Sequence, residues 1–191
     1  MPVEQSVACL QDLFKAGKYK AVGLSELSAG NICRAHELAG PIACVEMEWS
    51  LFSRDIEADI VPACRQLGIS IVAYAPLSRG LLTGAIKETP EDFRGTTPRF
   101  TEANLAANLK LVDAVEVLAR EKGVLTSQVA LAWVMAQGAD VVPIPGTTNP
   151  VNLASNVAAM GVALTTQDMA RLEAACPWEA VAGGRVPRTT P

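Results

Sequence analysis

The feature that most constrains the fold of this chain is a regular alternation of short β-branched runs with longer segments of helical periodicity. The runs that are typical of strands lie at residues 20–25, 42–48, 69–77 and 140–146. The segments that are typical of helices lie at residues 4–16, 28–38, 55–67, 103–123, 126–138, 150–159 and 166–175. Such an order predicts an α/β fold whose parallel strands are joined by right-handed crossovers. Half of the residues are hydrophobic but only 5% are aromatic, so the core is expected to be aliphatic, which suits parallel strands covered by helices.

Two architectures fit this order: a doubly wound open sheet and part of a (β/α)8 barrel. No GxGxxG sequence follows any expected strand, so the usual dinucleotide-binding signature of the open sheet is missing. A complete barrel needs eight strands and roughly 250 residues, whereas we find four strands in 191 residues. We find no linker, and therefore expect a single domain over residues 1–191, with a polar loop at 85–101 and a mobile tail at 177–191.

Composition and charge argue against several classes of function. The net charge is −4, and no basic patch stands out, so nucleic acid is not an expected partner. The longest apolar runs are too short to cross a membrane, and the N-terminus lacks the pattern of a secretory signal, so we expect a cytoplasmic protein without a membrane partner. The five cysteines show no CxxC spacing and His36 is the only histidine, so no metal site is expected.

Function in parallel α/β folds lies at the C-terminal ends of the strands, and each expected strand here ends in small or polar residues. The candidates are Ser25 and Glu26 after the first strand, Glu46 and Glu48 in the second, residues 74–80 after the third, and residues 145–149 after the fourth. Thr147 and Asn149 precede a helix that opens at Pro150. Residues of these types cap helices more often than they bind phosphate, although the free N–H groups of a helix start also form an anion site.

The other candidates also have structural explanations. Tyr74 lies on an apolar strand, where a tyrosine is usually a core residue with a bonded hydroxyl. Arg79 follows the third strand, in a loop where an arginine is usually solvated. Glu46 and Glu48 lie on the same side of their strand, either as an acid–base pair or, as we favour, within a salt-bridged interior.

The order of the motifs changes how these signals are weighed. The chain contains, in sequence, KAVGLSELS, VEMEWSLFSR, VAYAPLSRGLLTG, DFRGTTPRF, LAWVMAQG and PIPGTTNPVNLASN. Over residues 4–175 this series resembles the aldo-keto reductase family, most closely its branch of plant auxin-induced-type and perakine or pyridoxal reductase-like enzymes. The resemblance implies the C-terminal half of a (β/α)8 barrel, strands five to eight, that binds NADP(H) without a Rossmann motif.

The resemblance also implies roles for individual residues. Ser25, Glu26 and Glu46 would hold the nicotinamide carboxamide, and Tyr74 would stack on the nicotinamide ring. Ala75, Leu77, Ser78 and Arg79 would line the pyrophosphate. The adenosine end would be held by Pro145, Gly146, Thr147, Thr148, Asn149, Ser155 and Asn156.

The sequence departs from the family pattern at both ends of this site. The family usually has Asn at position 26 and commonly Gln at position 46, whereas Glu26 and Glu46 can only accept hydrogen bonds when ionised. The family often has Lys or Arg near positions 149 and 152, whereas Asn149 and Asn152 cannot neutralise a 2′-phosphate.

The resemblance implies an oxidoreductase that reduces aldehydes or ketones, but no residue here matches the family's catalytic Asp, Tyr, Lys and His set, which belongs to the first four strands. We therefore assign no catalytic residue and expect the chain to be inactive alone, as the cofactor-binding half of a reductase with a small carbonyl substrate. The alternative is a non-catalytic half-barrel that serves as an interaction or nucleotide-binding module, in which two copies complete each other as a homodimer. An unrelated open-sheet binding protein is disfavoured because six motifs occur in family order.

Overall fold

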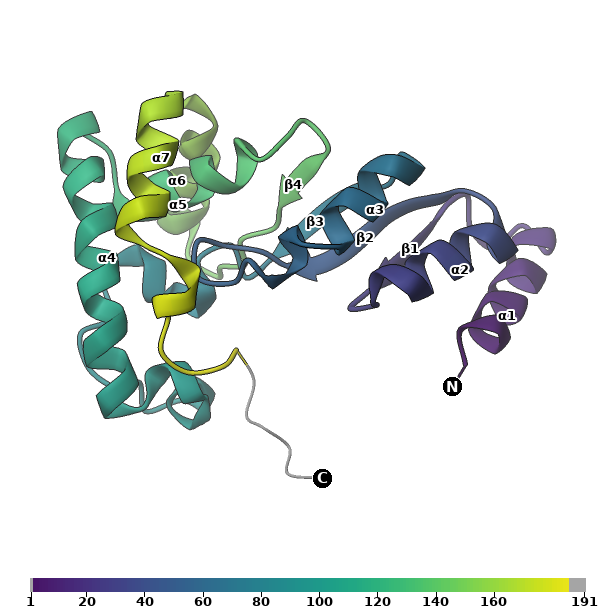
Figure 1. Cartoon of the computed structure of the whole chain (residues 1–191), viewed down its shortest axis with the longest axis horizontal. Coiled ribbons are helices and arrows are strands. Elements are labelled where there is room, and N and C mark those ends of the chain that lie inside the picture. Colours follow the sequence, from purple (N-terminus) through teal and green to yellow (C-terminus); the bar gives the residue numbers. More distant parts are fainter. Residues whose placement is uncertain (1, 186–191) are drawn as a thin grey trace.

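The computed structural model describes residues 2–185 and contains one parallel sheet of four strands in the order β1-β2-β3-β4. The strands are β1 Val22–Ser25, β2 Ile42–Glu48, β3 Ser70–Tyr74 and β4 Val141–Pro143. The helices are α1 Val3–Lys15, α2 Ala29–Ala39, α3 Ile60–Leu67, α4 Glu102–Lys122, α5 Thr126–Met135, α6 Pro150–Ala158 and α7 Thr166–Ala175. Figure 1 shows α4 to α7 gathered at one end of the molecule and α1 and α2 at the other, with the sheet between them.

Local sequence signals explain most of the element boundaries. Ser28 caps α2, since its hydroxyl accepts a hydrogen bond from the Asn31 amide at 3.4 Å. The helix expected over 55–67 is split into a 3-10 turn at Asp55–Glu57 and α3, so Pro62 lies in the first turn of a helix with a late start. The helix α5 begins at Thr126, and the capping position is Leu125, whose amide donates to the Gln128 side chain at 3.0 Å.

The two faces of the sheet differ in their surroundings. Val45, Ile71 and Val141 lie on the face that packs into the core with the helices, and all three are buried. The opposite face carries Val142, which is 53% exposed, and Ile144, directly after β4, is 43% exposed. Within the described residues, therefore, helices cover one face of the sheet and apolar side chains remain uncovered near β4.

The polar loop expected at 85–101 is anchored in the core. It contains two short 3-10 turns, Phe93–Thr96 and Pro98–Phe100. Phe100 is fully buried and Arg99 is 6% exposed. The loop thus brings a buried charge to the strand ends.

The segment after α7, predicted as a mobile tail over 177–191, is described as far as residue 185, and residues 186–191 lie outside the described part of the chain. It contains a 3-10 turn at Trp178–Ala180, and residues 181–183 and 185 are half-buried. The Asn108 side chain exchanges two hydrogen bonds with the Ala182 backbone, at 2.9 and 2.8 Å. Sequence composition missed this packing because Asn108 lies 74 residues away in the chain.

Among the residues that the structure describes, no helix combines the length and the apolar character needed to cross a bilayer.

Candidate functional site

Backbone strain is concentrated where β1 and β3 end. Among residues 2–185, four non-glycine residues have positive φ angles: Glu26 at 51°, Ala75 at 46°, Ser78 at 48° and Arg79 at 54°. An L-residue in this region carries a steric penalty of roughly 1 kcal/mol or more, and such residues cluster at functional sites. Their position at the C-terminal edge of a parallel sheet agrees with where such folds place their chemistry.

A groove of about 860 Å³ runs along this edge and gathers most of the predicted adenosine and pyrophosphate residues. Its volume lies within the range typical of small-molecule sites. The predicted residues that line it are Ala75, Leu77, Arg79, Pro145, Gly146, Thr147, Ser155 and Asn156. The loop after β3 therefore faces the loop after β4 and the α6 helix, although Arg79 and Pro145 are 66 residues apart in the chain.

The groove carries more positive than negative charge. Its basic lining residues are Arg79, Arg94 and Arg120, and its one acidic lining residue is Glu116. Arg94 was not among the predicted site residues; its Nη1 donates to the Arg79 carbonyl at 3.2 Å, which joins the polar loop to the end of β3. The predicted motif DFRGTTPRF contained this arginine, so the signal was present in the sequence.

Three of the residues predicted for the pyrophosphate and the adenosine do not line the groove, and neither do the four predicted for the nicotinamide. Ser78 is buried, and its hydroxyl accepts a hydrogen bond from Arg99 Nη1 at 3.3 Å. Asn149 caps α6, since its Oδ1 accepts from the Val151 amide at 2.8 Å, which matches the structural explanation considered above. Thr148 is exposed beside it. The Ser78 hydroxyl is therefore used inside the protein, where it accepts a hydrogen bond from the buried Arg99 guanidinium.

The residues predicted to hold the nicotinamide lie at the ends of β1, β2 and β3. The sheet register places Ser25 opposite Glu46 and Glu48 opposite Tyr74. Ser25 and Glu46 are exposed. The Oε1 atom of Glu26 accepts a hydrogen bond from the Glu48 amide at 3.2 Å, which fixes the carboxylate across the first two strands.

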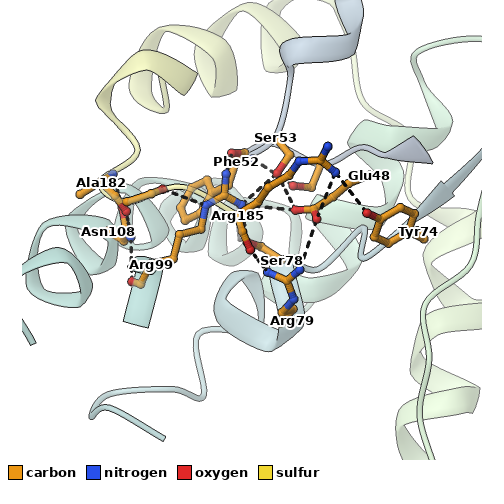
Figure 2. Close-up of polar contacts among 12 residues, drawn as sticks. Glu48, Phe52, Ser53, Tyr74, Ser78, Arg79, Arg99, Asn108, Ala182 and Arg185 are labelled. Atoms are coloured by element: carbon orange, nitrogen blue, oxygen red, sulfur yellow. Dashed lines mark hydrogen bonds and ion pairs between the residues drawn. The ribbon is translucent and has the colours of Figure 1, made fainter. Parts of the chain in front are cut away.

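The second glutamate of the predicted pair is the centre of a buried ionic cluster (Figure 2). Glu48 is 1% exposed, and its Oε1 accepts from the Ser53 hydroxyl at 2.8 Å and lies 3.5 Å from Arg99 Nη1. Its Oε2 lies 3.5 Å from Arg79 Nη2 and 3.8 Å from Arg185 Nη1. Glu46, on the same side of the strand, is exposed, so the two carboxylates have different surroundings, and the salt-bridged interpretation holds for Glu48.

Arg99 and Arg185 were not predicted as site residues. Arg99 donates to the Phe52 carbonyl at 2.6 Å and to the Ser53 hydroxyl at 2.9 Å, and burial lowers its pKa while Glu48 opposes that shift. Arg185 donates to both carboxylate oxygens of Glu26, at 3.0 and 2.7 Å. Arg99, like Arg94, belongs to the motif DFRGTTPRF, but no local pattern predicted its contact with Ser53, 46 residues away, or the contact of Arg185 with Glu26, 159 residues away.

These contacts shift the ionisation of the site. The hydrogen bonds from Arg185 lower the pKa of Glu26 below its ordinary value, so the carboxylate is ionised at neutral pH. Burial, together with the nearby Glu26 carboxylate, raises the pKa of Tyr74 to about 12. Tyr74 therefore presents a neutral phenol at neutral pH, and its hydroxyl accepts a hydrogen bond from Arg185 Nη1 at 3.1 Å.

The second tyrosine of the chain lies away from the strand ends. The hydroxyl of this residue, Tyr19, donates a hydrogen bond to the Leu10 carbonyl at 2.7 Å. Residues 2–185 contain no cluster of three or more His, Cys, Asp and Glu side chains arranged to hold a metal ion.

Comparison with known proteins finds a family whose members resemble this chain over most of its length. The sequence profile of the Aldo/keto reductase family matches residues 1–176. A curated relative, "Probable aldo-keto reductase 1" from Glycine max, is 45% identical over 188 residues, which are 97% of this chain and 54% of the relative. The chain thus spans about half the length of this relative.

Two solved structures share the fold. The glycerol dehydrogenase AKR11B4 from Gluconobacter oxydans aligns with a TM-score of 0.85 and 29% identity, over 100% of this chain and 58% of that one. The thermostable aldo-keto reductase Tm1743, solved with the inhibitor epalrestat, aligns with a TM-score of 0.71 over 92% of this chain and 55% of that one; at 24% identity it supports the fold alone. The predicted fold class, an α/β chain that forms part of a barrel, is confirmed.

Proposed function

Because this chain belongs to the aldo/keto reductase family, we propose that it forms the NADP(H)-binding part of an oxidoreductase that reduces aldehydes and ketones to alcohols. The observation that carries the proposal is the basic groove at the strand ends, which brings together the loops after β3 and β4 with α6. A bound nicotinamide cofactor supplies the hydride in such a reaction. The protein's contribution is to bind, orient and shield it.

The residues of the groove fit a dinucleotide in size and charge. We assign the pyrophosphate to the loop of Ala75, Leu77 and Arg79, where a guanidinium and strained backbone meet. We assign the adenosine end to Pro145–Thr148, Ser155 and Asn156, beside the start of α6, where the helix dipole favours an anion.

The 2′-phosphate of NADPH has cations within the same groove. Asn149 and Asn152 carry no charge, but Arg94 and Arg120 line the groove. These two guanidinium groups, which pair here with Asp92 and Glu116, support NADPH rather than NADH as the cofactor, since a phosphate dianion is bound best by charge-assisted hydrogen bonds.

Beyond the groove, at the ends of β1, β2 and β3, we assign Ser25, Glu26 and Glu46 to the nicotinamide carboxamide and Tyr74 to the ring. The neutral phenol of Tyr74 suits a stacking role, because it adds no charge beside the ring. We assign no residue of this chain as the proton donor to the carbonyl oxygen; in this proposal the chain binds and orients the cofactor for a carbonyl substrate.

The test is oxidation of NADPH, followed at 340 nm, by the full protein with a panel of aldehydes and ketones. We expect turnover with at least one carbonyl compound, and we expect Asn156→Ala to raise the Michaelis constant for NADPH by about tenfold, since a hydrogen-bonding group in the groove is lost. Asn31→Ala is the matched control, because Asn31 is exposed on α2 outside the groove. Absence of turnover with every carbonyl compound, with either NADPH or NADH, would contradict the proposal.

One observation favours the alternative of a non-catalytic half-barrel. Val142 and Ile144 remain exposed near one edge of the sheet, a surface that a second copy could cover. A homodimer of this chain that binds NADPH but turns over no carbonyl compound would support the alternative, and light scattering together with the assay above distinguishes the two.

A further inference from the structure

Arg185 lies at the nicotinamide end of the proposed site although it comes from the segment after α7. Figure 2 shows its guanidinium beside Glu48 and Tyr74. It forms two hydrogen bonds to Glu26, at 3.0 and 2.7 Å, and one to the Tyr74 hydroxyl, at 3.1 Å. None of the cofactor contacts assigned above explains why a tail residue should hold these two side chains.

The segment that carries Arg185 is fixed by its own contacts. The Arg185 carbonyl accepts a hydrogen bond from Arg79 Nη1 at 2.6 Å, and the Gly183 carbonyl accepts one from Arg99 Nε at 3.4 Å. Gly183 has a φ of +83°, and a Cβ atom there would lie only 2.6 Å from the Pro98 carbonyl carbon. Only glycine permits so close an approach of the two backbones, so the position of Arg185 is built into the fold.

The negative charge of Glu26 explains why a cation is needed at this end of the site. An ionised carboxylate beside the nicotinamide would stabilise the oxidised cofactor, whose ring is cationic, over the reduced cofactor, whose ring is neutral. Arg185 neutralises Glu26 through a bidentate pair, in which both carboxylate oxygens are bonded. The other charged groups nearby are Glu46, which is exposed, and Glu48, Arg79 and Arg99, whose buried cluster Arg185 also joins at 3.8 Å from Glu48 Oε2.

We propose that Arg185 is a positioning residue that neutralises Glu26, and thereby prevents the site from preferring the oxidised cofactor to the reduced one. This inference rests on the proposed function, because it takes Glu26 and Tyr74 to lie beside the nicotinamide. Glu26 alone offers a carboxamide only hydrogen-bond acceptors. Together with the Arg185 guanidinium it offers both acceptors and donors.

The experiment measures dissociation constants of NADPH and NADP⁺ for the full protein by calorimetric titration. We expect Arg185→Met to raise the ratio of the NADPH constant to the NADP⁺ constant by about tenfold, because Glu26 then acts unopposed. Arg185→Lys, which keeps the charge, should leave the ratio near that of the wild type. The double variant Glu26→Gln/Arg185→Met should also return the ratio to near the wild-type value, since it removes both charges.

Arg171→Met serves as the matched control, because Arg171 pairs with Glu121 on the exposed side of α7 and touches neither Glu26 nor Tyr74. If Arg185→Met weakens both cofactors equally, or if Glu26→Gln does not restore the ratio, Arg185 has a structural role only and the inference is overturned while the proposed function stands. If the wild-type protein binds neither cofactor, the proposed function falls and the inference falls with it.

Discussion

The carboxylate of Glu48 shows how single residues hold the strand ends together. It is buried among three guanidinium groups that come from the loop after β3, the polar loop and the segment after α7. A buried charge destabilises the fold unless an opposite charge is paired with it. The Glu48 carboxylate and the buried guanidinium groups therefore stabilise each other. The same cluster positions Arg79 at the proposed pyrophosphate site.

Removal of one partner from this cluster should therefore destabilise the protein strongly. We predict that Arg99→Met lowers the free energy of unfolding by about 3 kcal/mol, because Glu48 loses its nearest buried cation. Urea denaturation measures the change. Arg65→Met is the control: Arg65 pairs with Asp140 at 3.0 Å on the surface, and its loss should cost less than about 1 kcal/mol. Equal effects of the two substitutions would show that the cluster contributes no more than a surface pair.

At the scale of single elements, sequence patterns located the helices and strands well and their ends less well. The apolar pattern over 42–48 coincides with β2, since both ends carry clear signals, Pro41 before it and Trp49-Ser50 after it. The run over 69–77 continues past the end of β3 at Tyr74, because Ala75 turns to a φ of +46°. The expected strand pattern does not predict this turn, because the turn depends on how the following loop packs.

The residues of the candidate site also differ in how well the sequence could locate them. The groove residues that follow strand ends in the chain could be located from the sequence and from the resemblance together. The contacts of Arg99 and Arg185 could not, because each of these residues reaches its partner across the tertiary structure. A charged residue in a loop or tail carries no sequence signal that it will be buried.

The start of α7 offers a test of pH dependence. Asp168 Oδ2 lies 2.7 Å from Lys122 Nζ and accepts hydrogen bonds from the Thr165 amide and hydroxyl, both at 2.8 Å. The Lys122 ion pair, followed by the bonds from Thr165, lowers the pKa of Asp168 to about 2. Because the folded pKa lies below the unfolded value, the stabilisation is fully present above pH 4 and is lost as the pH falls toward 2.

We accordingly predict that Asp168→Asn lowers the thermal midpoint at pH 7, and that the difference from the wild type shrinks to near zero as the pH is lowered from about 4 to about 2. Thermal denaturation followed by circular dichroism over this range is the measurement. Asp12→Asn provides the comparison, since Asp12 is exposed and lies 3.7 Å from Lys15; its effect at pH 7 should be smaller. A difference for Asp168→Asn that stays constant with pH would contradict this account.

At the scale of the whole molecule, the four strands form one parallel sheet (Figure 1). Helices cover one of its faces, and Val142 and Ile144 at β4 are exposed. Within the described residues β1 and β4 each pair with one neighbour only. The chain also spans 54% of its Glycine max relative and 58% of the Gluconobacter oxydans enzyme. The proposed cofactor groove, by contrast, is lined by two strand-end loops and the helices beside them, all of which this chain contains.

The central claim, that this groove binds a nicotinamide dinucleotide, is tested most directly by hydrogen exchange of the full protein with and without NADPH, followed by mass spectrometry. We predict slower exchange of backbone amides in residues 75–86 and 145–156, which line the groove from its two sides. Amides of α1 and α2, which lie outside the groove, should exchange at unchanged rates. Unchanged exchange in both groove segments at saturating NADPH, or protection confined to α1 and α2, would contradict the account.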